Sequence, residues 1–437
     1  MDAYPVADAV RPSTTVRPAS SAYVRYVLAL VWMTLLLRFL DMQIVAVILE
    51  PIKAEFALTD LKLGLLSGLA FSVLYGTLGI PAGWLADRWN RRNLMALALS
   101  LWSAMTLLCG FAPSFALLLL ARVGVGIGEA GGTPPSFSLL ADYVSGPRRS
   151  SAFAFINAAQ PVGVFVGFMV IGTVASDYGW RAAFWAAGAP GMLLALLMLL
   201  TLREPTRGMS DALTASVSAP ALRQVVRYLA GLASYRHMVA ANTLLILGLA
   251  ASGIWIPSYF IRVHGFTIAQ IAPWLAFIYG IGGTAGAIGG GLLADNLIRR
   301  DIRNRVRFPA IAVTAAVPAL AVVFLTSNPM VALGTHVFAV ILMHAWLGPY
   351  HATIQDLAGA PRRSVATAVN LLVANVIGLG LGPLLVGALN DALMPSVGAS
   401  AIRYSILAVA SVAFLWAGLH FKMAARTLAS DLERARK

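Results

Sequence analysis

GWLADRWNRR, residues 83–92, has a counterpart in GLLADNLIRR, residues 291–300, and the aspartates of the two stretches lie 208 positions apart. A second polar pair follows in the same order, with DYVSGPRRS at 142–150 and DLAGAPRRS at 356–364, at an offset of 214. Apolar segments resemble one another by composition alone, whereas these matches fall in polar stretches. Two polar matches in one order therefore indicate that a unit of the chain has been duplicated.

The segments around these stretches have the composition of membrane helices. The chain has 437 residues, of which 59% are hydrophobic and 11% are charged, whereas about 25% of residues are charged in a soluble globular domain. Runs such as VGVFVGFMVIGTVA (162–175) are apolar without interruption. They suit helices of roughly 20 residues that cross a bilayer, and they lack the alternation typical of a membrane β-barrel.

Apolar segments between polar breaks predict twelve spans. They lie near residues 24–50, 60–85, 93–112, 115–140, 150–175, 181–202, 237–262, 269–294, 307–326, 330–356, 364–389 and 401–424. The predicted fold class is therefore an all-α integral membrane protein with twelve transmembrane helices in two six-helix bundles related by pseudosymmetry. Its expected parts are a flexible N-terminal tail (1–22), a first bundle (23–202), a linker (203–236), a second bundle (237–424) and a C-terminal tail (425–437).

The tail at 1–22 is rich in Pro, Ser, Thr and Val and shows no helical period, which favours a flexible segment. It is not read as a signal peptide, because the apolar segment that follows is long and carries Arg38 and Asp41.

The basic residues are distributed by side. If the N-terminus is cytoplasmic, the cytoplasmic loops and tails hold 25 Lys and Arg residues, and the outer loops hold 5. This asymmetry places both termini, the linker and the C-terminal tail in the cytoplasm. The net charge of +14 is then explained by topology, so no nucleic-acid partner is expected. The expected location is the plasma (inner) membrane, with multiple crossings.

The motifs resemble those of a known family. GWLADRWNRRNLM is similar to the G-x-L-A-D-R-x-G-R-R loop of the major facilitator superfamily, with Asn90 in place of the usual glycine. RVGVGIGEAGGTPP (122–135) resembles its fourth-helix motif, and residues 38–150 resemble the Spinster-like lysolipid and sphingolipid transporters. These transporters usually have arginine directly after the first-helix aspartate, whereas here Met42 follows Asp41 and Arg38 precedes it on the same helical face.

The resemblance implies a secondary carrier that works by alternating access, with its substrate site between the two halves. The implied substrate is an amphiphilic lipid of the lysophospholipid or sphingoid phosphate type. The alternative is a proton-driven carrier of a small organic anion or drug. Superfamily members often work as monomers, so a monomer is expected.

Four ionisable residues lie inside predicted spans: Arg38, Asp41, Arg122 and Glu129. A charge at the membrane centre costs roughly 2.5–3.5 kcal/mol, so these residues should pair. From the helical rise, Asp41 and Arg122 lie about 15 and 12 Å from the outer ends of their spans, and Arg38 and Glu129 about 20 and 22 Å. We therefore expect Asp41 near Arg122, and Arg38 near Glu129.

These pairs suit proton coupling. Burial disfavours a charged carboxylate and a nearby arginine favours it, so small helix movements change proton occupancy. Glu129 is the first choice for the proton site and Asp41 the second, while Arg122 could hold either carboxylate or an anionic headgroup. The alternative interpretation is a set of ion pairs that only fix helix packing.

Two further groups of residues are candidates for function. The loop motif predicts conformational gating through charge-assisted bonds that break and re-form, and its residues are Gly83, Asp87, Arg88, Arg91, Arg92, Asp142, Arg148 and Asp295. The second group consists of candidates for the substrate cavity. The family resemblance nominates four of them, namely Trp255, Tyr259, His344 and Tyr350. The others are Arg122, Glu129, Asn157, Gln160, Asn370 and Asn375. A single polar residue in a span is as often a helix-packing contact.

The stretch GIGEAG (126–131) has the spacing G-x-G-x-x-G, which in a βαβ unit binds dinucleotides. Here it lies within an apolar span, so we interpret its glycines as close-approach surface. Gly124 and Gly128 would admit a neighbouring backbone, while Gly126 and Gly131 would clear space beside Glu129.

Nothing in the motifs indicates an enzyme. There is no H-E-x-x-H, no G-x-S-x-G and no cluster of Cys and His, and the single Cys109 lies in an apolar run. No cofactor and no metal site is expected.

Overall fold

The structure, a computed structural model, describes residues 20–144, 146–205, 222–359 and 362–436. Within these ranges all regular secondary structure is helical. Ten described segments are long and apolar enough to cross a membrane. Two of them, Ser151–Thr201 with 51 residues and Arg363–Ala435 with 73 residues, are far longer than the roughly 20 residues that one crossing needs.

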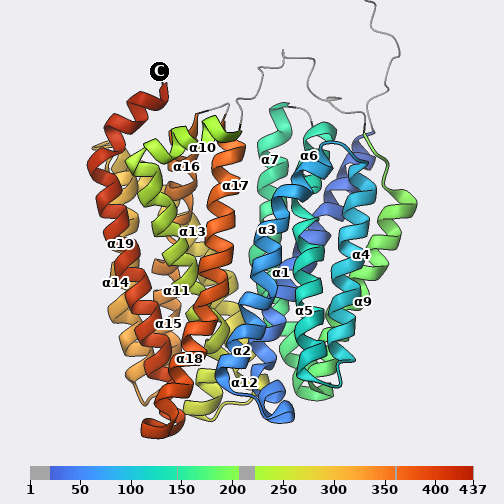
Figure 1. Cartoon of the computed structure of the whole chain (residues 1–437), viewed down its shortest axis with the longest axis vertical. Coiled ribbons are helices and arrows are strands. Elements are labelled where there is room, and N and C mark those ends of the chain that lie inside the picture. The colour runs from blue at the N-terminus through green and yellow to red at the C-terminus, as the bar shows by residue number, and fades with distance from the viewer. Residues whose placement is uncertain (1–19, 145, 206–221, 360–361, 437) are drawn as a thin grey trace, which may run out of the picture.

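The helices form two groups of consecutive elements that lie side by side (Figure 1). The first half contains α1 (Ser21–Phe56), α2 (Asp60–Ser67), α3 (Leu69–Ala86), α4 (Arg91–Gly110), α5 (Phe115–Ala130), α6 (Thr133–Tyr143), α7 (Gly146–Asn157), α8 (Ala159–Val166), η1 (Gly167–Ile171) and α9 (Gly172–Thr201). The second half contains α10 (Leu222–Gly231), α11 (Ala233–His264), α12 (Ile268–Phe277), η2 (Ile278–Gly282), α13 (Gly283–Ile298), α14 (Asn304–Leu325), α15 (Pro329–His344), α16 (Leu347–Ala358), α17 (Arg363–Val373), η4 (Ala374–Leu379), α18 (Gly380–Val397), η5 (Gly398–Ser400) and α19 (Ala401–Arg436).

The two longest apolar segments each turn at a glycine with a positive φ. Gly179 interrupts α9 at φ 84°, and Gly398 follows α18 at φ 58°. Residues with a Cβ rarely adopt this backbone conformation, whereas glycine adopts it readily. The turns lie between the predicted spans 150–175 and 181–202, and between 364–389 and 401–424.

Some predicted spans are not single helices. The predicted span 115–140 is divided into α5 and α6 at Gly131 and Gly132, and α6 begins with two prolines in its first turn. Proline is favoured there because it lacks the N–H that a first-turn residue leaves unpaired. The predicted span 60–85 is likewise divided, at Gly68. Sequence hydropathy does not register such breaks because the helix remains apolar on both sides.

In the part of the chain that the structure describes, three spans contain a π-helical segment: η1, η2 and η4. π-Helical turns occur often at functional sites. η1 and η4 lie at corresponding places in the two halves, which extends the repeat seen in the polar loops.

We call the end of the molecule that holds α10 and residue 205 the linker end. The start of α1 and the end of α19 lie at this end as well, as Figure 1 shows. Part of the predicted linker 203–236 is helical, as α10, and the predicted tail 425–437 continues α19 as far as Arg436. The predicted N-terminal tail, apart from its last residues, lies outside the described residues.

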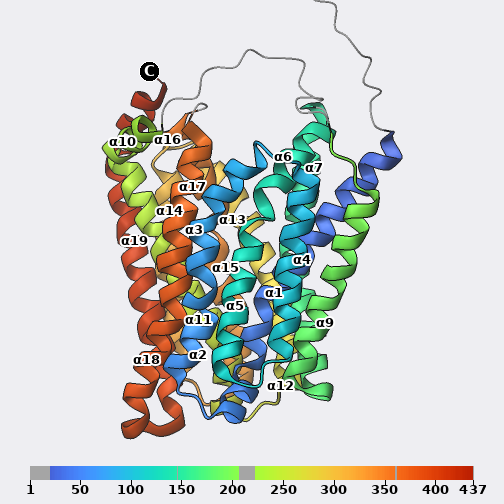
Figure 2. The same ribbon diagram turned by 45° about the vertical axis from the view of Figure 1, so that its right-hand side comes forward.

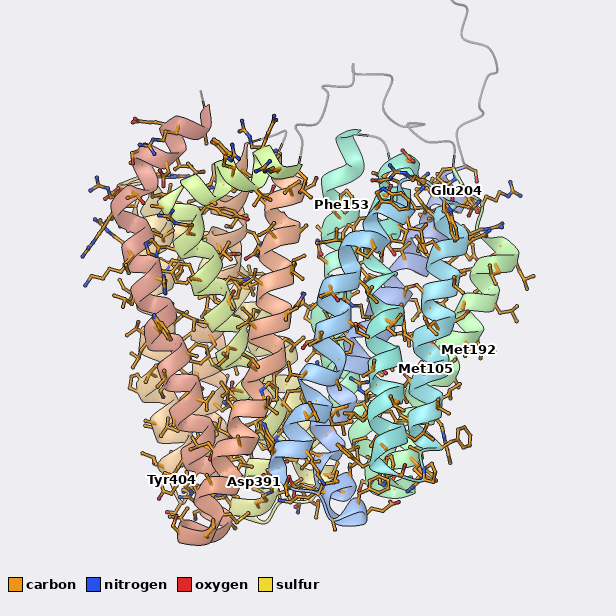
Figure 3. The ribbon with its side chains drawn as sticks, viewed as in Figure 1. Met105, Phe153, Met192, Glu204, Asp391 and Tyr404 are labelled. Atoms are coloured by element: carbon orange, nitrogen blue, oxygen red, sulfur yellow. The ribbon has the colours of Figure 1, made fainter. Side chains whose placement is uncertain are left out.

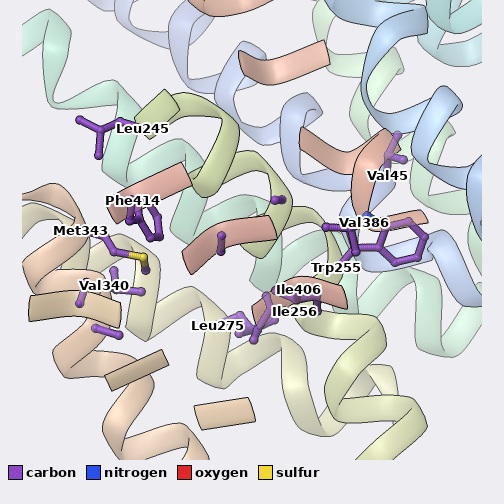
Figure 4. Close-up of a cluster of buried hydrophobic side chains, with 14 of the residues drawn as sticks. Val45, Leu245, Trp255, Ile256, Leu275, Val340, Met343, Val386, Ile406 and Phe414 are labelled. Atoms are coloured by element: carbon purple, nitrogen blue, oxygen red, sulfur yellow. The ribbon is translucent and has the colours of Figure 1, made fainter. Parts of the chain in front are cut away.

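The two halves pack together at the end opposite the linker. There α2 packs against α18 and α1 against α11. At Gly64, an added Cβ would lie 2.5 Å from the carbonyl oxygen of Pro383, so only glycine permits this approach of the two backbones. One apolar cluster contains Val45, Val386 and Trp255 and so includes both halves (Figure 4).

Candidate functional site

Two buried ion pairs join α1 to α5. Nε of Arg38 lies 3.1 Å from Oε2 of Glu129, and Nη1 of Arg122 lies 3.3 Å from Oδ2 of Asp41. All four side chains are buried. The pairing predicted from the helical rise is therefore confirmed.

Three polar side chains complete these pairs, and the sequence did not point to any of them. Arg38 donates to the hydroxyl of Thr133 (3.0 Å) and to that of Tyr75. Thr106 donates to Oδ1 of Asp41 at 2.9 Å. The break between α5 and α6 places Thr133 within reach of Arg38 because it is the first residue of α6.

Two atoms of the four-residue cluster have no hydrogen-bond partner among the described residues. They are Oε1 of Glu129 and Nε of Arg122, and both are buried. A buried polar atom without a partner costs about 1–3 kcal/mol. The cluster therefore retains capacity to take up a proton at Glu129, whereas both oxygens of Asp41 already accept hydrogen bonds.

The glycines of α5 let other helices approach this cluster. A Cβ at Gly128 would lie 2.5 Å from the backbone nitrogen of Trp102 on α4, and one at Gly126 would lie 2.5 Å from the carbonyl oxygen of Phe71 on α3. The prediction for Gly128 is confirmed. The prediction for Gly126 is wrong, because this glycine admits the α3 backbone and leaves no free space.

At two other glycines the nearest atoms of another helix belong to side chains. Gly124 meets the side chain of Met105, and Gly131 faces the Cβ of Ala98 at 3.1 Å. The prediction that Gly124 admits a neighbouring backbone is therefore wrong, and Gly131 leaves little room.

A cavity of about 520 Å³ lies between the halves, towards the linker end. Its wall in the first half comes from α3, α6 and the last residue of α5, and its wall in the second half comes from α16, α17 and η4. Most of the lining is apolar. The polar residues that line it are Tyr75, Thr133, Gln355, Arg363, Ser364, Thr367 and Asn375. Figures 1 and 2 both show α3 beside α17 along this face.

Two side chains connect the cavity wall to the buried Arg38–Glu129 pair. Tyr75 and Thr133 line the cavity, and both accept a hydrogen bond from Arg38. Glu129 itself is 0% exposed. These two hydroxyls and Arg38 therefore connect the cavity wall to Glu129.

An ionic cluster closes the end opposite the linker. Arg262 on α11 contacts Glu50 (2.8 Å) and Asp60 (2.7 Å), both from the first half. Asp60 also accepts from Lys53 and from Asn390 on α18. The backbone N–H groups of Asp60 and Leu61 donate to Asp391 at 2.9 and 2.8 Å. The sequence showed only isolated charges in separate loops here.

A second ionic cluster lies at the linker end, within the first half. Arg91 is 2% exposed and contacts Asp142 at 2.5 Å and Glu204 at 2.7 Å. The side chains labelled Glu204 and Asp391 in Figure 3 mark the two ends of the molecule. The cluster at the linker end holds α4, α6 and the segment after α9 together, whereas the opposite cluster joins the two halves.

The comparisons with known proteins agree on one family. The model of the Major Facilitator Superfamily matches residues 31–383. The chain belongs to the Major Facilitator Superfamily. It is thus a multi-pass membrane transporter and not an enzyme, with the all-helical fold of this superfamily.

Three similar proteins show which members of the superfamily this chain resembles. An MFS-type efflux pump of Mycolicibacterium smegmatis is 31% identical over 408 residues, which is 92% of each chain. Protein spinster homolog 3 of Danio rerio is 25% identical over 99% of this chain and 90% of its own. A bacterial homologue of the human lysosomal transporter Spinster, crystallised in an inward-facing and unoccupied conformation, superimposes with a TM-score of 0.85 at 28% identity, over 94% of this chain and 99% of that chain. The Spinster-like resemblance of the motifs is confirmed.

Some of the predicted cavity residues line the cavity, and others lie away from it. Asn375 lies in η4 and lines the cavity opposite Tyr75. Trp255 and Tyr259 are fully buried in the second half, where their side chains donate to the backbone oxygens of Pro383 (3.0 Å) and Val323 (2.7 Å). The prediction that Trp255 and Tyr259 line the cavity is wrong for this conformation, because packing and hydrogen bonding hold both within the second bundle.

Further candidates lie away from the cavity as well. Tyr350 donates to Asn370 at 2.5 Å, and Asn370 also accepts from Asn242 at 3.1 Å, in a buried network within the second half. His344 bonds through Nδ1 with the carbonyl oxygen of Val340, one turn earlier in α15. Asn157 and Gln160 are exposed and are not among the residues that line the cavity.

The predicted gating residues lie at the linker ends of their helices. Arg91 and Asp142 are brought together, whereas Glu204, which completes their cluster, was not predicted. Arg88 stacks on Trp84 at 4.1 Å, and Arg92 donates to the carbonyl oxygen of Leu202 at 3.4 Å. Asp87 is the C-cap of α3, and its backbone N–H donates to the carbonyl oxygen of Gly83, one turn earlier. Asp295 is exposed in α13. The side chain of Arg148 lies outside the described residues.

Proposed function

We propose that this chain is a proton-coupled secondary transporter in which Glu129 is the proton site. The observation that carries the proposal is the unpartnered Oε1 of Glu129, held beside an arginine whose other donors reach the cavity wall. A proton on Glu129 removes the charge that holds Nε of Arg38. Arg38 then interacts more strongly with Tyr75, Thr133 or an anionic group in the cavity.

Asp41 and Arg122 form the second pair of this proposal. Their contact lies on the same two helices and responds to the same movement of α1 against α5. Arg122 retains an unpartnered Nε, so it has a donor left for a carboxylate that comes closer in another conformation. Asp41 is therefore the second candidate for proton exchange.

The proposal of alternating access is supported by a difference between the two ends of the molecule: the halves are packed together at one end, and the cavity lies towards the other. Contacts that include the Arg262 cluster and the α2–α18 packing hold the end opposite the linker closed, while the cavity lies towards the linker end. We infer an inward-facing conformation, as described for the bacterial Spinster homologue. Opening the opposite end requires Arg262 to leave Asp60 and Glu50. The loop motif around Asp87, Arg91 and Asp295 is then placed to re-form contacts between helix ends.

The proposal includes the arrangement in the membrane. The turns at Gly179 and Gly398 divide the two longest apolar segments, and twelve crossings result, in bundles 23–202 and 237–424. An even number of crossings places both termini on one side, and the distribution of basic residues makes that side the cytoplasm. We also propose, from the superfamily resemblance, that the protein works as a monomer in the plasma membrane.

The proposed substrate is an amphiphilic lipid with one chain, of the lysophospholipid or sphingoid phosphate type. The resemblance of the motifs to the Spinster-like transporters implies this class, and relatives named Spinster are among the similar proteins. The cavity has apolar walls that include Ile80, Leu371 and Leu372, and Arg363 lies at its linker end. An acyl chain matches the walls, and a phosphate matches the guanidinium.

The second candidate is a proton-driven carrier of a small organic anion or drug. The efflux pump at 31% identity favours it. Asn375 and Gln355 also line the cavity and suit a polar solute. The two candidates differ in the substrate and share the proton site.

Reconstitution into liposomes separates the two. Uptake of a radiolabelled lysophospholipid and of a hydrophilic organic anion is measured with an inward or outward pH gradient and without one. The lipid proposal predicts gradient-dependent movement of the lysophospholipid alone. Movement of the anion alone supports the second candidate, and gradient-independent movement of either contradicts proton coupling.

A further inference from the structure

A second hollow, of about 1050 Å³, lies on the outer surface of the second half. Its walls are α14 and α19, which pack against each other and lie at the edge of the molecule away from the first half (Figure 1). Ile311, Leu415 and Leu419, which line it, are 68%, 49% and 52% exposed. The hollow is therefore a groove that faces the surroundings of the protein and is separate from the cavity between the halves.

Four basic residues gather at the linker end of this groove. Arg303 directly precedes α14, and Arg307 lies one turn later on this helix. Lys422 and Arg426 lie one turn apart on α19. Arg307 contacts Asp301 at 2.9 Å. Among the described residues, no carboxylate lies within 4 Å of a side-chain nitrogen of Arg303, Lys422 or Arg426. Within the described part of the chain, three of the four cations at this end of the groove therefore have no carboxylate partner.

Apart from Thr314, the residues that line the rest of the groove are apolar. Small residues, among them Ala310, Ala315 and Gly418, line this apolar part, which we call the floor of the groove. At Gly418 the helices are so close that a Cβ would lie 2.5 Å from the hydroxyl of Thr314. From Arg307 to Pro318 the groove follows α14 over 11 helical steps, about 16 Å. This length matches half of the roughly 30 Å hydrocarbon core, which is one leaflet.

We propose that this groove binds an anionic phospholipid, with its phosphate among the four basic residues and an acyl chain along the apolar floor. Basic pockets between helices at the cytoplasmic surface suit such headgroups. A second copy of this chain does not suit the groove. A symmetric dimer would place the four cations of one copy against those of the other, and the chain has a net charge of +14. Free phosphate would leave the apolar floor empty.

The site is independent of the proposed transport function, because no residue of the groove lines the cavity between the halves or contacts the two buried ion pairs. Its occupant is a bilayer lipid with two chains.

Native mass spectrometry of the purified full chain tests the proposal. Phosphatidylglycerol and phosphatidylcholine with the same acyl chains are added at equal concentration in detergent, and bound lipid is counted. The variant Arg303→Gln/Lys422→Gln/Arg426→Gln removes three cations from the groove. The matched control, Arg223→Gln/Arg227→Gln/Arg236→Gln, removes three exposed arginines at the same end of the second half but outside the groove.

The wild type and the control are expected to prefer phosphatidylglycerol, and the groove variant is expected to lose affinity on the order of a hundredfold. A second variant, Ala315→Trp, fills the floor, leaves every charge in place, and is also expected to lose the lipid. Elution as a single peak in size-exclusion chromatography checks that each variant is folded. Equal binding of both lipids by the wild type, an equal loss in the control, or full binding by Ala315→Trp would each overturn the proposal.

Discussion

Glu129 and Asp41 are both buried beside an arginine, but their hydrogen bonding differs. Asp41 accepts from Thr106 with one oxygen and from Arg122 with the other. Glu129 accepts from Arg38 with one oxygen, and its second oxygen has no partner among the described residues. This difference supports Glu129 as the group that exchanges a proton, and Asp41 as the better-held partner of Arg122.

The Asp41–Arg122 pair gives a stability prediction. Asp41→Asn keeps the size of the side chain and leaves the charge of Arg122 buried without its partner. Removing one member of a buried pair costs about 3–5 kcal/mol. We expect a lower temperature of unfolding in detergent for Asp41→Asn and partial recovery in Asp41→Asn/Arg122→Gln. A single variant as stable as the wild type contradicts the pairing.

The hydroxyl of Tyr75 gives a prediction about coupling. Tyr75→Phe keeps the ring that stacks on Phe71, with centroids 5.1 Å apart, and removes the bond to Arg38. A hydrogen bond to a charged group contributes about 1.5–3 kcal/mol. We expect the ratio of transport with and without a pH gradient to fall. Tyr178→Phe, at a side chain that is 77% exposed, is the matched control and should leave this ratio unchanged.

At the scale of the elements, the proposed site depends on how closely α5 lies against α3 and α4. Gly128→Val places a Cβ 2.5 Å from the backbone of Trp102, and overpacking of this kind costs about 1–3 kcal/mol. Gly334→Val on α15 is the control, because no atom lies within 4 Å of an added Cβ there. We expect a lower unfolding temperature and weaker transport for Gly128→Val only. Equal effects of the two substitutions would show that valine in a membrane helix, and not the approach of α4, is responsible.

The Arg262 cluster predicts how the end opposite the linker opens. Arg262→Gln removes the charge that bridges Glu50 and Asp60 across the halves. Spin labels on Lys62→Cys and Ser396→Cys, in a Cys109→Ala background, report the distance between α2 and the end of α18. We expect longer distances to become more populated in Arg262→Gln.

The control for this experiment is Arg181→Gln. Arg181 pairs with Glu55 at 2.6 Å at the same end, but both lie in the first half. Its substitution should leave the distance distribution unchanged. An unchanged distribution in Arg262→Gln as well would mean that helix packing keeps this end closed without the Arg262 ion pairs.

For the whole molecule, the sequence predicted the features that follow from periodicity and repetition. The polar repeats around Asp87 and Asp295 indicated two halves, and the helical rise paired Arg38 with Glu129. Tyr75 and Thr133 were not predicted, because a lone hydroxyl in an apolar span has no pattern around it. Arg262 and Asp60 are 202 residues apart and meet only through the packing of the two halves, which a single sequence does not specify.

In the proposed mechanism, proton exchange at the buried ion pairs is linked to the opening and closing of the two ends of the molecule. Protonation of Glu129 changes what Arg38 holds in the cavity wall, and opening of the opposite end changes the position of α1, which carries Arg38 and also Glu50 of the closing cluster. Because one helix carries a residue of each site, movement of α1 links proton exchange to the opening of either end.

Proton flux driven by substrate tests the central claim most directly. The protein is reconstituted in liposomes that contain a pH-sensitive dye, lysophospholipid is added without an imposed gradient, and the change in internal pH is recorded. The wild type and Glu433→Gln, a variant at an exposed carboxylate near the end of α19, should move protons when substrate is added. Glu129→Gln should still bind substrate but move none. Proton flux of wild-type size in Glu129→Gln would contradict the assignment of Glu129 as the proton site, and substrate transport by the wild type without proton flux would contradict proton coupling itself.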